Sequence, residues 1–284
     1  MKDGILHWNV DPELFWITDS FPLKYYGLCW LIGLGLGYYI VQRVYQKEKI
    51  PLENLEELSL YIFIGAFLGA RLGHCFFYEP SYYFQNPLEI LLPIKKVGDS
   101  FTFVGFQGLA SHGGVLGIIF GILLYAKKTG TNLLWILDRV AIGAPVGSAF
   151  IRIGNLMNSE IYGKPTNGNW GVVFERDDLI PRHPTQIYEA LAYFLIFGIL
   201  MAIYKSKKIK KHNGLLVGAL LVLLFTARFF IEFFKENQVD FEDSMALNMG
   251  QLLSIPYIVL GLLLIFYGKS RFATKLSADG AVKQ

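Results

Sequence analysis

A dense group of polar residues interrupts an otherwise apolar region of the chain between Arg152 and Gly163. An arginine, two asparagines, a serine and Glu160 lie within nine residues of this stretch. One such arginine alone would be explained by snorkelling to lipid headgroups, and one asparagine by helix capping. Because polar groups beside hydrocarbon are costly, a cluster of this density instead predicts a functional site.

Three further polar stretches carry side chains of the types used in catalysis. They are Gly108–Gly114 with His112, Arg182–Glu189 with His183, and Arg228–Glu232. Simpler explanations exist, since a histidine at a helix start often has a capping or interfacial role. Arg228 and Glu232 stand four residues apart on one helix face and can pair with each other. A pair buried only for structure would contribute little, however, because apolar replacements usually do as well.

Taken together, these stretches predict one polar pocket. It would combine two arginines, two carboxylates and a histidine, namely Arg152, Arg228, Glu160, Glu232 and His112. Arginine forks bind phosphate oxygens through two hydrogen bonds, and a phosphate at membrane depth most simply belongs to a phospholipid. The sequence has no glycine-rich nucleotide loop on a strand, no HExxH and no metal-spaced cluster. We therefore expect neither a cofactor nor a metal.

The composition favours a lipid bilayer as the solvent of this chain. Of its 284 residues, 53% are hydrophobic and only 17% are charged, whereas soluble domains carry about a quarter charged residues. The net charge of +3 is too small to indicate a nucleic-acid partner. We therefore expect one membrane domain, residues 1–284, with the fold class of an all-α polytopic membrane protein.

Seven apolar stretches are each long enough to cross about 30 Å of hydrocarbon as a helix. They cover about residues 23–41, 55–78, 109–126, 133–153, 187–204, 215–234 and 249–267. Glycines recur at four-residue spacing in the second and third spans, which predicts helix faces that a neighbouring helix can approach closely. These glycines are Gly65, Gly69 and Gly73, and Gly113, Gly117 and Gly121.

Basic clusters follow the first, third, fifth and seventh spans. By the positive-inside rule, the N-terminus is outside, the C-terminus is inside, and all four polar stretches converge on the outer half of the membrane. The polar loop at about residues 155–186 then forms a small extracytoplasmic head, and we expect an arm outside the membrane as well. Residues 79–107 also lie outside, and within them residues 87–93 are expected to lie along the membrane surface.

Six stretches together resemble the prolipoprotein diacylglyceryl transferases of bacteria. They are Tyr25-Tyr-Gly27, Gly69-Ala-Arg-Leu-Gly73, Ser111-His-Gly-Gly114, Arg152-Ile-Gly-Asn-Leu-Met-Asn-Ser-Glu160, Arg182-His-Pro-Thr-Gln-Ile-Tyr-Glu189 and Arg228-Phe-Phe-Ile-Glu-Phe-Phe234. The resemblance runs from about Tyr25 to the last span in the order of the family. Ile151 and Leu156 stand where the family usually has glycine and phenylalanine, both at packing positions, and Lys235 stands where some members carry arginine.

The resemblance implies a seven-span enzyme of the bacterial cytoplasmic (inner) membrane. Such an enzyme transfers the diacylglyceryl group of phosphatidylglycerol to the lipobox cysteine of a preprolipoprotein signal peptide, in the first step of lipoprotein maturation. A thioether forms and glycerol phosphate leaves. Membrane lipid and the preprolipoprotein are therefore the expected partners, and no nucleic acid is expected.

The resemblance also implies a set of site residues. The catalytic residues would be His112, Arg152 and Arg228. The substrate-binding residues would be Tyr26, Asn155, Glu160, Gly163, His183, Glu189, Glu232 and Lys235. In this assignment His112 takes the thiol proton, the arginines stabilise the leaving phosphate, and Glu160 and Glu232 orient the arginines. Alternatively, the arginines themselves lower the pKa of the thiol and leave His112 a positioning role.

Two other classes of function compete with this assignment. A transporter or flippase for an anionic lipid would also use buried arginines and glycine-broken helices. It would, however, continue its polar residues to the inner side, whereas the inner halves of the third, fifth and sixth spans are almost wholly apolar. A scaffold subunit would use the same arginines only for assembly.

Overall fold

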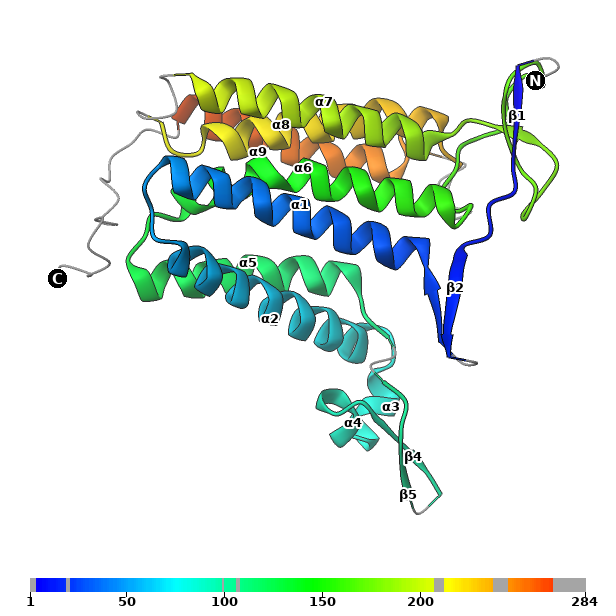
Figure 1. Ribbon diagram of the computed structural model, residues 1–284, viewed down its shortest axis with the longest axis horizontal. Helices are drawn as coiled ribbons and strands as arrows, with labels where there is room; N and C mark the ends of the chain where they lie inside the picture. The colour runs from blue at the N-terminus through cyan, green and yellow to red at the C-terminus, as the bar shows by residue number, and fades with distance from the viewer. Residues whose placement is uncertain are drawn as a thin grey trace. The chain divides into compact units, whose positions relative to one another are not determined.

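The computed structural model describes residues 4–18, 21–98, 100–105, 108–206, 212–236 and 245–267 (Figure 1). The chain divides into two compact units. The first comprises residues 1–44 and 137–272, and the second comprises residues 45–136 and 273–284. The predicted basic positions 207–211 and those beyond residue 267 lie outside the described residues.

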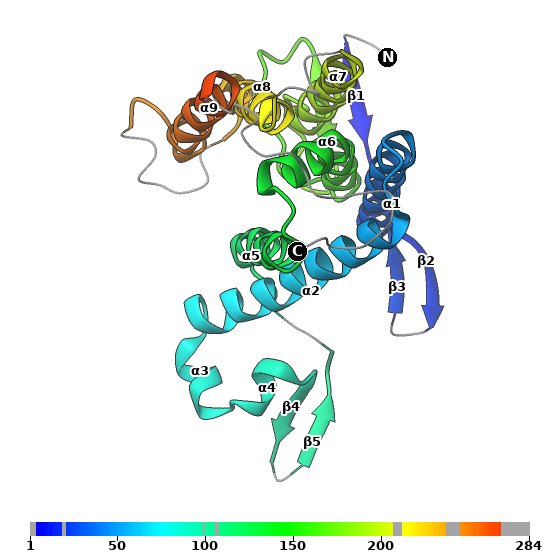
Figure 2. The ribbon, with the colours of Figure 1, turned by 90° about the vertical axis from the view of Figure 1, so that its left-hand side faces the viewer.

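The first unit is a bundle of long helices. Its helices are α1 (Tyr25–Lys47), α6 (Leu133–Met157), α7 (Thr185–Lys205), α8 (Leu215–Ile231) and α9 (Met249–Tyr267). The last turn of α1 and the first turn of α6 belong to the second unit. In Figures 1 and 2, α6, α7, α8 and α9 run side by side. Small and aliphatic residues such as Ala149, Leu200 and Leu216 fill the space between them, which allows close packing.

Asp138, one of two charged residues that interrupt the fourth predicted span, has a structural role. Its carboxylate is fully buried on α6 and accepts hydrogen bonds from the backbone amides of Gly214 (2.8 Å) and Val217 (2.9 Å). The first amides of a helix have no partner within the helix itself. Asp138 therefore caps the start of α8 from a neighbouring helix and fixes the two helices together.

Short strands lie outside the helices of the first unit. The N-terminal strand β1 (Ile5–Trp8) pairs in parallel with β6 (Gly171–Phe174), which pairs antiparallel with β7 (Pro181–Arg182). The indole Nε1 of Trp8 donates a hydrogen bond to the carbonyl of Leu156 (3.0 Å), so this sheet is tied to the end of α6. A second pair, β2 (Glu13–Thr18) and β3 (Phe21–Lys24), forms an antiparallel hairpin ahead of α1.

The second unit is built on α2 (Leu52–Phe77) and α5 (Ser111–Thr129), which pack with their glycine faces together. A Cβ at Gly69 would lie 2.3 Å from the carbonyl oxygen of Gly113, and one at Gly65 would lie 2.3 Å from that of Gly117. The close approach predicted from the glycine spacing is thus confirmed. Between the two helices the chain forms α3 (Pro80–Gln85), α4 (Leu88–Leu91) and the hairpin of β4 (Ile94–Val97) and β5 (Ser100–Phe103).

Six of the described helices are long and apolar enough to cross a membrane, as expected of a multi-pass membrane protein. They are α1, α2, α6, α7, α8 with the short 3-10 turn Glu232–Phe234 that follows it, and α9. The remaining predicted span, the third in chain order at about residues 109–126, is covered from residue 111 onward by α5. This helix is not among the six; Ser111 and His112 stand at its start, and Lys127 and Lys128 stand in its last turn.

Candidate active site

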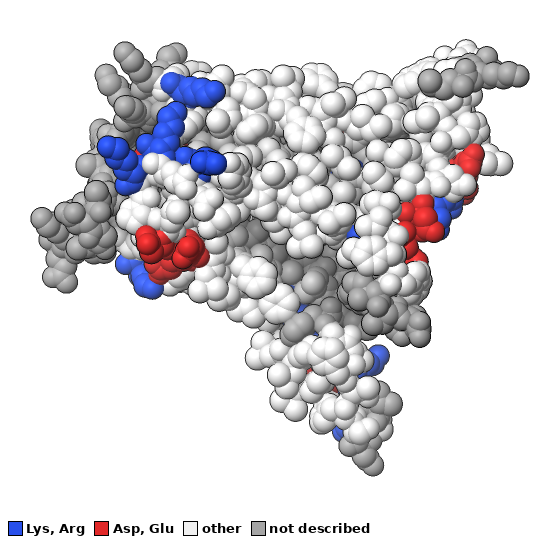
Figure 3. All heavy atoms as spheres, viewed as in Figure 1, with Lys and Arg blue, Asp and Glu red and all other residues white. Residues whose placement is uncertain are grey.

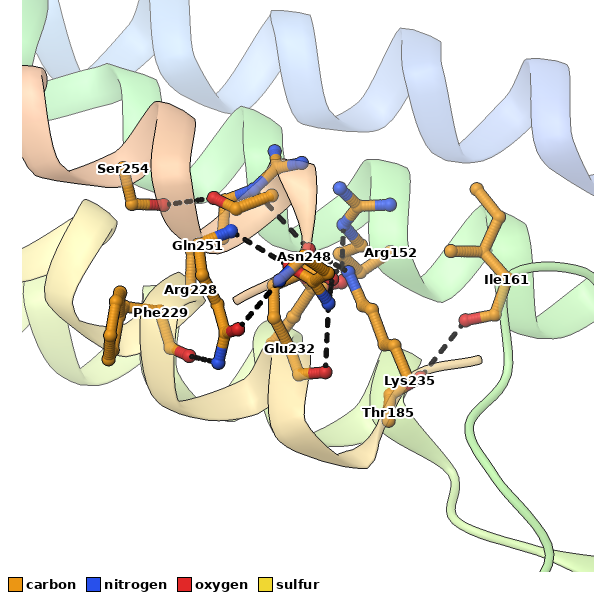
Figure 4. A network of polar contacts seen from close by, with 12 residues as sticks. Arg152, Ile161, Thr185, Arg228, Phe229, Glu232, Lys235, Asn248, Gln251 and Ser254 are labelled. Carbon is orange, nitrogen blue, oxygen red and sulfur yellow. Dashed lines mark hydrogen bonds and ion pairs between the residues drawn. The ribbon is translucent and has the colours of Figure 1, made fainter. Parts of the chain in front are cut away.

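The two arginines singled out by the sequence belong to one chain of ion pairs in the first unit (Figure 4). Arg152 Nε lies 2.8 Å from Glu189 Oε2, and Glu189 Oε1 lies 3.0 Å from Lys235 Nζ. Lys235 Nζ also lies 3.2 Å from Glu232 Oε1, which is 3.4 Å from Arg228 Nε. Residues from α6, α7 and the end of α8 therefore form a single charged network.

This network is buried at one end and open at the other. The exposed fraction of the side chain is 0% for Glu189, 18% for Arg152 and 37% for Arg228. Within the described residues, the terminal nitrogens of Arg228 have no hydrogen-bond partner, because its pairing with Glu232 uses Nε. In Figure 4 the guanidinium groups of Arg152 and Arg228 lie on the same side of the network. Both can therefore serve one ligand.

The partner of Arg152 differs from the hypothesis that Glu160 orients it. Arg152 pairs directly with Glu189, and it reaches Glu160 only through an amide. Its Nη1 donates to Asn155 Oδ1 (3.0 Å), and Asn155 Nδ2 donates to Glu160 Oε1 (2.7 Å). Asn158 Nδ2 donates to the same oxygen (3.3 Å). Glu160 is thus held by two amides, while Glu189 holds the arginine.

The backbone around Glu160 is strained. Ser159 and Ile161, on either side of it, have positive φ angles of 55° and 58°, a region that a β-branched residue rarely adopts. Two side chains of α7 hold this turn in place. Thr185 Oγ1 donates to the carbonyl of Ile161 (3.0 Å), and Gln186 Nε2 donates to the carbonyl of Glu160 (2.8 Å). Such strain persists only where the surroundings enforce it, as at functional sites.

Three segments of the chain meet at Gly163. It forms a β-bridge with Lys235, and its amide donates to the carbonyl of His183 (2.8 Å). A Cβ at this position would lie 2.3 Å from the carbonyl oxygen of Phe234 and 2.8 Å from the Cβ of His183. Only glycine therefore lets the backbone carrying Lys235 come this close.

The start of α9 closes the network from another side (Figure 4). Asn248 Oδ1 accepts from the amide of Gln251 (2.9 Å), and Gln251 Oε1 accepts from the amide of Asn248 (3.0 Å). This reciprocal arrangement is a capping box. Asn248 Nδ2 also donates to Glu232 Oε2 at 3.5 Å, and Gln251 Nε2 donates to the carbonyl of Phe229 at 3.4 Å. The cap thereby orients the carboxylate that pairs with Arg228. Sequence reasoning missed it, although the spacing Asn-x-x-Gln was visible.

Tyr26 and His183 lie near the network without joining it. Tyr26 of α1 packs on Gly154, where an added Cβ would lie 2.9 Å from its ring carbon Cδ2. His183 stands among aromatic rings, with centroids 4.9 Å from Trp170 and 5.0 Å from Phe234, and its Nδ1 lies 3.2 Å from the hydroxyl of Tyr188. Burial in these surroundings lowers the pKa of His183 below its ordinary value. His183 therefore favours the neutral form.

Arg182, which the sequence left unexplained, is a structural residue beside this site. Its Nη2 lies 2.6 Å from Asp178 Oδ2, its Nη1 lies 2.5 Å from Glu236 Oε1, and its guanidinium carbon lies 4.9 Å from the ring centre of Tyr162. The hydrogen bond from Arg182 holds the pKa of the Asp178 carboxyl below its ordinary value. These contacts fix β7 and the segment that follows α8.

His112, the remaining predicted residue, belongs to the second unit. It is exposed in the first turn of α5, and glycines follow it directly in the helix. An exposed imidazole beside residues without side chains can be reached by a ligand.

Comparison with known proteins identifies the family of the chain. The profile of the family described as "Prolipoprotein diacylglyceryl transferase" matches residues 12–267. The phosphatidylglycerol–prolipoprotein diacylglyceryl transferase of Bacteroides fragilis is 49% identical over 268 residues, covering 94% of this chain and 96% of the relative. The enzymes of the same name from Chloroherpeton thalassium and Rickettsia bellii are 43% and 35% identical, covering 92% and 94% of this chain and 93% and 98% of their own lengths. The chain belongs to the prolipoprotein diacylglyceryl transferase family.

Proposed function

We propose that this protein transfers the diacylglyceryl group of phosphatidylglycerol to the lipobox cysteine of prolipoproteins, the first step of their maturation. The relatives that cover nearly its whole length bear the name of this activity. The reaction forms a bond between the cysteine sulfur and the terminal carbon of the diacylglyceryl group. It breaks the bond between that carbon and the phosphate oxygen, and glycerol phosphate leaves with the bonding electrons.

The observation that carries the proposal is the charge of the ion-pair chain. Arg152, Lys235 and Arg228 contribute three positive charges, whereas Glu189 and Glu232 contribute two negative ones, so the chain has one positive charge in excess. A phosphodiester headgroup supplies one negative charge and suits the open fork of Arg228. The phosphate gains further negative charge as the carbon–oxygen bond breaks, and the two arginines are placed to stabilise it.

The remaining site residues support this chemistry by position. Glu189 and Glu232 orient the two guanidinium groups, and Asn155 links Arg152 to Glu160. Gly163 brings Lys235 into place, and Tyr26 packs against the segment that carries Arg152. His183 and the aromatic rings around it form a wall for the substrate.

His112 is the base that we propose for the cysteine thiol. An unperturbed thiol has a pKa of about 8.5 and must lose its proton to attack carbon. The alternative is that the arginines lower the pKa of the thiol without a base. A His112→Gln variant that turns over at a near-normal rate across neutral pH would remove His112 as the base.

We further propose that the protein spans the bacterial cytoplasmic membrane seven times, with α5 as the third span, the N-terminus outside and the C-terminus inside. Residues 155–186 then form the extracytoplasmic head, together with β1. Within the second unit, Lys127 and Lys128 stand at one end of α5 and the α3–β5 segment follows the opposite end of the α2–α5 pair, which suits this orientation.

One assay separates the three classes of function. The purified protein is given phosphatidylglycerol and a lipobox peptide, and the thioether product is measured by mass spectrometry beside Arg152→Ala and Arg228→Ala. The wild type forms the thioether, and each variant loses on the order of 100-fold or more in rate. A lipid transporter or a scaffold subunit would form none.

A further inference from the structure

The second unit contains a polar cavity of about 350 Å³, lined by none of the residues that we propose for the transfer reaction. Its walls come from the end of α2, from α3, α4 and β4, and from the loop that leads to α5. It is lined by Arg71, His74, Glu79, Tyr82, Tyr83, Glu89, Ile94, Lys95, Val104, Gly105 and Gly108. The volume is that of a small-molecule site, and no member of the ion-pair chain lines it.

The walls of this cavity are held by a buried arginine. Arg71 is only 4% exposed, and its guanidinium donates hydrogen bonds to the carbonyls of Ile90 (3.0 Å), Glu89 and Gly108 (3.4 Å). A Cβ at Gly108 would lie 2.1 Å from His74 Nε2, so glycine is required there for the loop to pass the imidazole. These contacts tie α2 to α4 and to the loop before α5, and they give the cavity fixed walls.

The charged groups of the lining balance one another. Arg71 and Lys95 are positive, whereas Glu79 and Glu89 are negative. The Glu89 carboxylate already accepts from the hydroxyl of Tyr82 (2.7 Å) and from the amide of Lys96 (2.8 Å). Burial alone would raise its pKa, but these hydrogen bonds keep the pKa of Glu89 below its ordinary value and the group ionised.

Two opposite charges remain for a ligand to meet. Lys95 is exposed, and Glu79, whose side chain is 54% exposed, lies 3.6 Å from His74 Nε2 through its Oε1. The cavity therefore offers a lysine ammonium group, and a carboxylate with a neighbouring imidazole. A ligand that carries a phosphate and an ammonium group, and no net charge, matches such a lining better than an anion does.

The surroundings of the cavity indicate where such a ligand comes from. Large apolar side chains stand exposed on α3, α4, β5 and the turn after α4, namely Phe84, Leu88, Leu91, Leu92, Phe101 and Phe103. Figure 3 shows mostly uncharged atoms over this segment. A polar cavity beside exposed apolar side chains suits a molecule with a polar head and hydrocarbon tails.

We propose that this cavity binds the headgroup of a zwitterionic phospholipid, with its phosphate near Lys95 and its ammonium near Glu79. This site differs from the one proposed for phosphatidylglycerol in ligand and in residues. It attaches the α3–β5 segment to the membrane surface, and its occupancy does not depend on the transfer reaction.

The test uses the purified full chain and native mass spectrometry, with phosphatidylethanolamine and phosphatidylglycerol of matched acyl chains as probes. Lys95→Ala and Glu79→Gln are each expected to weaken retention of phosphatidylethanolamine at least about 5-fold, the loss of one charge-assisted hydrogen bond. Retention of phosphatidylglycerol should stay unchanged in both. Lys96→Ala is the matched control, because Lys96 lies on the same hairpin and carries the same charge but does not line the cavity.

The Arg152→Ala variant separates this proposal from the proposed function. It should weaken the retention of phosphatidylglycerol and leave the retention of phosphatidylethanolamine unchanged. The proposal is overturned if Lys95→Ala and Glu79→Gln retain phosphatidylethanolamine as the wild type does. It is also overturned if both variants weaken the retention of the two lipids equally. Soluble glycerophosphoethanolamine provides a further arm. If it displaces the lipid at equal concentration, the hydrocarbon tails contribute nothing and a membrane lipid is not the ligand.

Discussion

Lys235 and Glu189, 46 positions apart in the sequence, are joined inside the first unit by a hydrogen bond of 3.0 Å between Nζ and Oε1. The side chain of Lys235 is 6% exposed and that of Glu189 is fully buried. Because Lys235 also contacts Glu232, it links the carboxylate that orients Arg152 to the one that orients Arg228. The distance between the two guanidinium groups therefore depends on this lysine.

Replacing Lys235 with methionine is expected to destabilise the protein by about 3–5 kcal/mol, because two buried carboxylates lose their shared cation. Thermal unfolding in detergent measures the change. Lys235→Arg, which keeps the charge, is the control and should lose much less stability. Adding Glu232→Gln to Lys235→Met should recover part of the loss, and a Lys235→Met protein as stable as the wild type would contradict this account.

Replacing Arg228 with lysine keeps the charge but removes the fork that we propose to bind the phosphate. We expect kcat/KM for thioether formation to fall on the order of 100-fold, because lysine acts as a point charge and cannot bind a phosphate through two hydrogen bonds. Arg43→Lys is the matched control, since Arg43 contacts only Tyr39 within α1 among the described residues. Equal activity of the two variants would show that Arg228 contributes charge alone.

Replacing Gly163 with alanine is expected to push apart the segments that carry Lys235 and His183, because the new Cβ would meet the Phe234 carbonyl oxygen at 2.3 Å. A displacement of about 1 Å at a catalytic site can lower the rate about 100-fold. The rate of thioether formation measures it. Gly198→Ala, at a helical position with nothing within 4 Å, should retain normal activity and stability. Full activity of Gly163→Ala would mean that the β-bridge does not position the site.

Stability is expected to fall as the pH drops below about 6.5, the ordinary pKa of histidine, in part because of His183. The lowered pKa of His183 means that the folded protein binds this proton less readily than the unfolded chain does. Stability therefore rises with pH while the unfolded chain is protonated and levels off above that range. Thermal unfolding at pH 7.5 and pH 5.5 measures the difference, and His183→Phe should make it smaller.

The sequence predicted the helices, and the ion pair within one helix, better than it predicted the contacts between helices. Apolar length marks a helix locally, and the spacing of Arg228 and Glu232 already indicates an ion pair. The pairing of Arg152 with Glu189 joins two helices, and no local pattern distinguishes Glu189 from Glu160 as the partner. The two asparagines that hold Glu160 leave it as an outer member of the site.

The sequence also did not predict the strands, because no local pattern reveals a pairing between distant segments. In the first unit, β1 pairs with β6 across most of the chain, and each strand has only four residues. Such short strands carry too few residues for an alternating pattern to stand out. Trp8, which precedes the first predicted span, ties this sheet to the end of α6.

The order of synthesis gives the ion-pair chain a consequence for assembly of the protein. During synthesis, Arg152 reaches the membrane before Glu189 has been added to the chain, and Glu189 reaches it before Lys235. Until Lys235 has emerged, the buried carboxylate of Glu189 lacks one of its two cationic partners, and such a group is costly in hydrocarbon. We expect chains that stop short of Lys235 to remain with the insertion machinery or be degraded, which pulse-labelling of truncated chains would detect. Quality control during biogenesis is thus built into the same charges that we propose to bind the lipid substrate.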